Sequence, residues 1–172
     1  MNKQIAIILL SFYFLGCAAT VPLTEEEKSY QKVFEFESSK VELFTKSLDW
    51  STSTFTGSHQ LVFKQTLLDP GAILETGVQH SDKETGVIMS NGYVEILSFP
   101  VLKINYTCRI DCKEKRVRFT FSNFQYWFDA GVNIRDWADI QKGMLTKLHP
   151  ELDKLIEDYK TKMKSQTLDN NW

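Results

Sequence analysis

The chain has 172 residues, 42% of them hydrophobic, and its 20 Lys and Arg against 22 Asp and Glu give a formal net charge of −2. This composition is that of an ordinary globular protein with one core, and it excludes the excess of positive charge that marks a nucleic-acid-binding surface. The one dense basic cluster is interrupted by Glu114 and falls at a predicted hairpin turn, so we expect no nucleic-acid partner; it consists of Lys113, Lys115, Arg116 and Arg118.

The first 16 residues have the pattern of a secretory signal. Lys3 precedes an almost unbroken apolar run over residues 5–14, and Leu15-Gly16-Cys17 ends it. The run is shorter than the roughly 20 residues that span a bilayer, and it has the length of a signal-peptide core. Its end resembles the lipobox of bacterial lipoproteins, in which a small residue precedes a cysteine that is diacylated before the signal is removed; Phe14 and Leu15 depart from the usual lipobox residues.

The lipobox resemblance implies a signal peptide over 1–16, a lipid on Cys17 and a linker over 17–28. It also implies an outer-membrane position facing the periplasm, because Ala18 is not an inner-membrane retention signal. The alternative is ordinary cleavage after Ala19, which discards Cys17. Both predict export. The remaining roughly 155 residues suit a single domain, which we expect at 29–166 with a flexible tail at 167–172.

A first strand is predicted over residues 30–37, with Phe34 and Phe36 directed inward. A helix follows it, because Ser39 and Glu42 have the spacing of a capping box. Helical spacing predicts one buried side formed by Val41, Phe44, Leu48 and Phe55, with Trp50 near its rim. The Ser and Thr residues at 51–54 lower helix propensity, so the helix is expected to fray near 56–57.

The region 58–77 has no pattern that assigns it to a helix or a strand. Beyond it, two short strands are predicted over 78–80 and 86–90, joined by the turn Asp82-Lys83-Glu84-Thr85. Asn91-Gly92 predicts a second turn, which leads into a strand at 93–96.

The clearest prediction is a hairpin over residues 104–123, where apolar and polar side chains alternate. A two-residue turn at Glu114-Lys115 pairs Cys112 with Val117, Ile110 with Phe119 and Cys108 with Phe121, which makes one face wholly apolar. On the other face Asp111 opposes Arg118 and Arg109 opposes Thr120. A shift of one residue would bury these charges, so a single register satisfies both faces.

The cysteines of this hairpin are predicted to be free. Cys108 and Cys112 lie on one face of a strand about 13 Å apart at 3.3 Å per residue, whereas a disulfide needs Cα atoms within about 7 Å. The three histidines, His59, His80 and His149, have no ligand-type spacing, so we expect no metal.

Four large rings follow the hairpin, at Phe124, Tyr126, Trp127 and Phe128. A single strand cannot direct all four into one core, so at least one is expected to reach an edge or the far face. An exposed aromatic patch there would mark a partner or ligand surface. The alternative, which we favour, is burial under the C-terminal helices.

The C-terminal part is predicted to be helical in two pieces. One apolar stripe comprises Ile134, Trp137, Ile140, Met144 and Leu148, and a second comprises Leu152, Leu155, Ile156, Tyr159 and Met163. Pro150 separates them, which predicts a bend or restart at His149-Pro150. The polar side carries mixed charges, with Asp158 and Lys162 spaced to pair, which favours a helix packed on a sheet over one lying on a membrane.

Several of these motifs, in this order, resemble the bacterial domain of unknown function with a TATA-binding-protein-like (TBP-like) fold. They are Glu42-Leu43-Phe44 with Trp50 and Phe55, the stretch 82–88 with Gly92, and the strands 106–111, 116–119 and 122–124. The resemblance covers about residues 30–124, with extra residues between Phe55 and Val78. It implies an α+β fold, namely an antiparallel sheet with one helix after the first strand and C-terminal helices packed on the sheet. It brings no catalytic residues, and the fold's name implies no DNA binding.

No sequence motif for catalysis is found. A Gly-rich phosphate loop, His-Glu-x-x-His and Gly-x-Ser-x-Gly are all missing from the sequence, and His80 with Asp82 has no third partner. We therefore expect a non-enzymatic envelope lipoprotein without a cofactor that binds another envelope component, as yet unidentified. The first alternative is an exported domain that holds a small apolar ligand between sheet and helices. An envelope hydrolase ranks third.

Overall fold

The computed structural model describes residues 23–55, 77–98, 101–129 and 138–168, with side chains except at 97–98, 101, 127–129 and 166–168. Its elements are β1 (Tyr30–Glu35), α2 (Lys40–Phe55), β2 (Gly77–Asp82), β3 (Val87–Ser98), β4 (Val101–Lys113), β5 (Arg116–Asp129), β6 (Ala138–Asp139) and α3 (Lys142–Leu168). The predicted signal peptide, Cys17, the helix end near 56–57, most of 58–77 and the stripe residues Ile134 and Trp137 lie outside these ranges.

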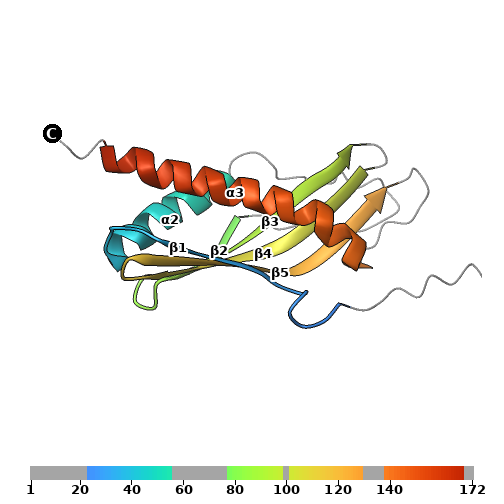
Figure 1. Cartoon of the computed structure of the whole chain (residues 1–172), viewed down its shortest axis with the longest axis horizontal. Coiled ribbons are helices and arrows are strands. Elements are labelled where there is room, and N and C mark those ends of the chain that lie inside the picture. The colour runs from blue at the N-terminus through green and yellow to red at the C-terminus, as the bar shows by residue number, and fades with distance from the viewer. Residues whose placement is uncertain (1–22, 56–76, 99–100, 130–137, 169–172) are drawn as a thin grey trace, which may run out of the picture.

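The strands form one antiparallel sheet with α2 and α3 packed on the same face (Figure 1). Strand order is β1-β5-β4-β3-β2, and β6 pairs with the far part of β5. The opposite face of the sheet is called the outer face below. This arrangement confirms the predicted α+β class, with a helix after the first strand and a helix at the C-terminus. The space between sheet and helices is occupied by large side chains such as Trp50, Phe119, Phe121 and Tyr159, each exposed by 1% or less.

The hairpin of β4 and β5 has the predicted register on both faces. Cys112 lies opposite Val117, Ile110 opposite Phe119 and Cys108 opposite Phe121. On the outer face the Asp111 carboxylate accepts hydrogen bonds from Arg109 (2.8 Å) and Arg118 (3.1 Å). The turn residue Lys115 has φ +56°, a left-handed conformation that non-glycine residues adopt mostly in tight turns.

A β-bulge interrupts β5 and reverses which of its residues face the core. Asn123 and Phe124 together lie opposite the single residue Tyr106, and Asn123 has φ +55°. Before the bulge Phe121 points toward the helices, and after it Phe124 does, so the inward positions change from odd to even numbers. The bulge thus turns Phe124 and Tyr126 toward the core side.

The buried side of α2 is rotated from the predicted one. Leu43 and Trp50 are at most 1% exposed, whereas Val41 is 55% exposed, because the stripe that packs inward has Ser47 and Ser51 at its centre. These small residues allow close approach, and the Ser47 hydroxyl lies 2.9 Å from that of Tyr159 on α3. The capping box is half formed: the Glu42 N–H donates to Ser39 Oγ (3.3 Å), while the Glu42 carboxylate pairs with Lys46.

The turn predicted at Asn91-Gly92 is wrong, because β3 continues through both residues. Asn91 pairs with Thr107 and Gly92 with Tyr106. Gly92 serves close packing instead: a Cβ there would lie 2.9 Å from the Phe55 ring and 2.9 Å from the Tyr106 hydroxyl. The other predicted turn is confirmed, and Asp82 Oδ1 accepts hydrogen bonds from the N–H groups at both 84 and 85.

The C-terminal helix does not restart at Pro150. It runs unbroken over Lys142–Leu168, since the buried residues on both sides of the proline, Leu148 and Leu152, hold the two halves on the same sheet. Proline costs a helix interior about 3 kcal/mol, which the burial of several large side chains exceeds. The predicted pair on its polar side is also replaced by contacts to α2: Asp158 accepts from Trp50 Nε1 (2.8 Å), and Lys162 Nζ donates to Ser53 Oγ (2.8 Å).

Both cysteines of β4 are free and buried, as predicted. Burial raises the pKa of the Cys108 thiol and of the Cys112 thiol, which suppresses the reactive thiolate. In the Cys17→Ser variant of the full chain we expect no alkylation of the native protein, and two alkylations after denaturation without reductant, by intact mass. Alkylation that appears only after a reductant is added would contradict the free-thiol assignment.

Candidate functional site

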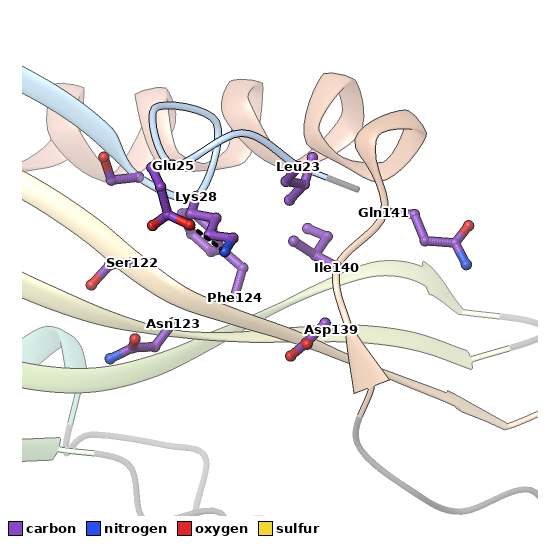
Figure 2. A pocket seen from close by; sticks show the side chains of 10 residues that line it. Leu23, Glu25, Lys28, Ser122, Asn123, Phe124, Asp139, Ile140 and Gln141 are labelled. Atoms are coloured by element: carbon purple, nitrogen blue, oxygen red, sulfur yellow. Dashed lines mark hydrogen bonds and ion pairs between the residues drawn. The ribbon is translucent and has the colours of Figure 1, made fainter. Parts of the chain in front are cut away.

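The edge of β5 is left without a partner strand in the described ranges between the start of β1 and the end of β6. β1 pairs with β5 as far as Phe121, opposite Tyr30, and β6 pairs with Gln125 and Tyr126. Between them, residues 122–124 face no strand of the described ranges on this side. A pocket of about 730 Å³ opens here, called the edge pocket (Figure 2); it is lined by Leu23, Glu25, Lys28, Ser29, Ser122, Asn123, Phe124, Asp139, Ile140 and Gln141.

The helix side of the edge pocket is apolar. Phe124 and Ile140 are 5% and 6% exposed, and Leu23 packs against the same core. The Ile140 N–H donates to the Phe124 carbonyl at 3.4 Å, which ties the segment entering α3 to the bulge of β5. The bulge therefore positions this wall, because without it Phe124 would point to the outer face.

The outer side of the edge pocket is polar. Ser122 pairs with Thr107, and Asp139 pairs with Gln125, so both project toward the outer face. Asn123 Nδ2 donates to Thr107 Oγ1 (3.3 Å), which in turn donates to Asn91 Oδ1 (3.1 Å). This chain of hydrogen bonds across three strands fixes the bulge residue. In Figure 2 the Asp139 side chain points away from Leu23 and Ile140.

The third wall is the turn that precedes β1. Thr24 and Glu27 bond each other reciprocally, because each backbone N–H donates to the other's side chain (3.0 and 3.3 Å). Glu27 also pairs with Lys142 at the start of α3, and this contact lowers the pKa of the Glu27 carboxyl. The described part of the predicted linker is thus folded onto the domain.

The start of β1 is fastened to α3 as well. The Tyr30 hydroxyl donates to Asp153 Oδ1 (2.7 Å), and the Tyr30 ring stacks on His149 at a centroid distance of 4.4 Å. The turn wall of the edge pocket is therefore attached to α3 at two places, through Glu27 and through Tyr30.

The charges around the edge pocket do not cancel. Lys28 and Glu25 form an ion pair at 2.6 Å, and that hydrogen bond is the main cause of the raised pKa of Lys28, to which the more distant Asp139 adds. The Asp139 carboxylate has no hydrogen bond or ion pair within the described ranges. One negative charge is left over, on the outer side of the pocket.

The structure describes the side chains of two of the four rings in the aromatic run, Phe124 and Tyr126. Phe124 is buried, as the favoured alternative expected, because the bulge turns it toward Ile140, and it forms part of the helix-side wall of the edge pocket. Tyr126 is half-buried against the core, and the side chains of Trp127 and Phe128 lie outside the described residues. Sequence reasoning missed Leu23 and Asp139, which are brought together only by the fold.

The acidic turn predicted from the sequence has a structural role. Asp82 holds its turn, and the hydrogen bonds from Thr85 are the main cause of its lowered pKa. Among the described residues no group of three or more His, Cys, Asp or Glu side chains is arranged to hold a metal. Within the same ranges, no helix is long and apolar enough to cross a membrane.

Comparisons with known proteins bear on the fold. Residues 30–127 match the family described as domain of unknown function (DUF4468) with TBP-like fold. A crystal structure of a DUF4468 family protein from Bacteroides ovatus ATCC 8483 is similar with a TM-score of 0.54 at 10% identity, over 86% of this chain and 90% of that one. A crystal structure of a TBP-like protein from Parabacteroides distasonis ATCC 8503 is similar with a TM-score of 0.50 at 23% identity, over 70% of this chain and 69% of that one. A search of curated proteins gave no match.

Proposed function

The chain belongs to the DUF4468 family of domains with a TBP-like fold, and on this premise we propose that it is a non-enzymatic, lipid-anchored binding module of the bacterial cell envelope. Its binding site is the edge pocket, and its ligand is another envelope component. The observation that carries the proposal is the open edge of β5 at residues 122–124, framed by three walls from distant parts of the chain.

The shape and lining of the edge pocket support recognition of a partner. Its volume of about 730 Å³ lies within the 300–1,000 Å³ usual for binding sites. Two of its charged groups, Glu25 and Lys28, are joined in an ion pair, an arrangement that suits recognition better than proton transfer. We rank the partner above a small apolar ligand between sheet and helices, because Trp50, Phe119 and Tyr159 already occupy that layer.

The anchor is supported by the sequence of the first 17 residues, in which Gly16 precedes Cys17 after an apolar run. We expect Cys17→Ser to abolish labelling of the protein by a fatty-acid analogue and to move it from the membrane to the soluble fraction of lysed cells. The mature protein should begin at Cys17. A wild-type protein without lipid that begins at Thr20 would contradict the anchor while leaving export intact.

The binding site is tested by crosslinking in intact cells. A photoreactive amino acid at Gln141, which is exposed and lines the edge pocket, should give a discrete adduct with an envelope protein that mass spectrometry identifies. The matched control is the same amino acid at Val41, which is 55% exposed on α2. Equal adducts at both positions, or none at Gln141, would contradict the proposed site.

A further inference from the structure

We propose that the edge pocket binds an extended segment of about three residues from the partner, added as a short strand against β5, with a basic side chain directed to Asp139. This inference rests on the proposed function and specifies the chemistry of its partner.

The backbone of β5 supplies the template. Ser122 pairs with Thr107 on the β4 side, and no described strand pairs with residues 122–124 on the other side. There the Phe124 carbonyl already accepts the Ile140 N–H, so an added strand would use the main-chain groups that precede this bond. An exposed sheet edge of this kind is where an added strand forms main-chain hydrogen bonds. Three residues at about 3.3 Å each give a gap of about 10 Å, which fits an extended segment of the same length. The length of the gap therefore limits the ligand to a short segment or a chain end.

The side chains at the edge pocket match the alternation of such a segment. Successive residues of a strand point to opposite faces of the sheet. On the helix side the wall consists of Leu23, Phe124 and Ile140, and on the outer side it contains Ser122 and Asp139. A central apolar residue of the bound segment would contact Phe124, and its two neighbours would project toward the outer side. A free ion or a small sugar has no such alternation.

The charge of the edge pocket favours a basic residue next to the central apolar residue of the bound segment. Glu25 is neutralised by Lys28 at 2.6 Å, whereas the Asp139 carboxylate forms no hydrogen bond or ion pair in the described ranges and acts on Lys28 only from a distance. A Lys or Arg side chain beside Asp139 restores the balance, and an acidic side chain there would be repelled. The expected ligand thus has a basic residue next to its central apolar residue.

The experiment measures binding of short blocked peptides to the detergent-solubilised, lipidated full-length protein by fluorescence anisotropy. The first peptide is Ser-Lys-Val-Lys-Ser, the second has both lysines replaced by glutamate, and the third carries a methyl group on the backbone nitrogen of the valine. We expect the first to bind and the second to bind at least about tenfold more weakly, by charge selection. The third should lose binding, because methylation removes a strand hydrogen bond without changing charge.

Two variants of the protein test the role of the carboxylate. Asp139→Asn should weaken the first peptide about tenfold, whereas Asp49→Asn, which removes the same charge from the exposed side of α2, should leave its affinity unchanged. Both positions are on the surface, and circular dichroism checks that both variants fold. Equal binding of the lysine and glutamate peptides, tolerance of the backbone methyl group, or no effect of Asp139→Asn would each overturn the inference.

This outcome is separable from that of the proposed function. A partner crosslinked from Gln141 through a folded, acidic surface, together with peptides that do not bind, would leave the binding module intact and refute the basic extended segment. Binding of the lysine peptide without any cellular adduct would support the basic extended segment and contradict the proposed envelope partner.

Discussion

Replacing Phe119 by alanine should lower the free energy of unfolding by about 3–5 kcal/mol, a large share of the 5–15 kcal/mol typical of a domain. The Phe119 side chain is fully buried. Its ring lies 5.8 Å from that of Trp50 on α2 and 4.8 Å from that of Tyr159 on α3, measured between centroids. It therefore joins the sheet to both helices, and the cavity left by alanine would be lined by atoms from all three elements.

Urea unfolding followed by tryptophan fluorescence measures this effect, and Thr120→Ala is the matched control. Thr120 is the next residue on β5, points to the outer face and is only half-buried. Its replacement should change the free energy of unfolding by less than about 0.5–1 kcal/mol. If Phe119→Ala and Thr120→Ala had the same effect, the register of the hairpin would be mistaken.

The second large effect is expected for Gly86→Ala, at the turn between β2 and β3. Gly86 has φ +80°, and a Cβ there would lie only 2.4 Å from the Cys112 carbonyl oxygen. The Gly86 carbonyl also accepts a hydrogen bond from the Cys112 N–H at 2.7 Å. The strained backbone alone costs about 1–3 kcal/mol, and displacement of β4 by the clash adds to it.

Gly143→Ala is the control for the same substitution. Gly143 lies at the start of α3, and no atom would lie within 4 Å of a Cβ there. Because alanine favours helix by up to about 1 kcal/mol over glycine, this variant should be as stable as the wild type or more so. Thermal unfolding of both variants under identical conditions gives the comparison. A Gly86→Ala protein with unchanged stability would show that the turn does not pack on β4.

The β4–β5 hairpin could be predicted because its two faces impose the same register. Apolar residues from Cys108 to Phe121 and charged residues such as Asp111 and Arg118 are both satisfied by one pairing, so local pattern and tertiary environment agree. The stripe of α3 from Leu152 to Met163 was predictable for the same reason, since helical spacing coincides with burial.

The errors arise where packing decides between local alternatives. Asn91-Gly92 has the composition of a turn, but Phe55 from α2 lies over Gly92 and requires a glycine within a strand. A proline such as Pro150 usually breaks a helix, but the burial of Leu148 and Leu152 on either side of it maintains the helix. In each case the deciding neighbour is distant in the sequence, so the local pattern does not contain it.

The edge pocket was not predictable for a related reason. Its walls come from residues 23–29, 122–124 and 139–141, and only the topology of the sheet makes them neighbours. One local signal does exist. Asn123 tolerates the left-handed conformation that a bulge needs, and it stands where the inward positions change from Phe121 to Phe124. An asparagine where the alternation of apolar and polar residues along a strand breaks thus indicates a β-bulge, after which the opposite set of residues faces the core.

The docked turn at residues 24–28 sets the reach of this module. Leu23 lies in the wall of the edge pocket, and only residues 18–22 separate it from Cys17. Six steps of extended chain cover at most about 20 Å. With a lipid on Cys17, the pocket would stay within that distance of the membrane surface. Its partner would then have to expose its segment next to the same membrane. A longer chain between Cys17 and Leu23 would let the pocket reach more distant proteins without any change in its affinity.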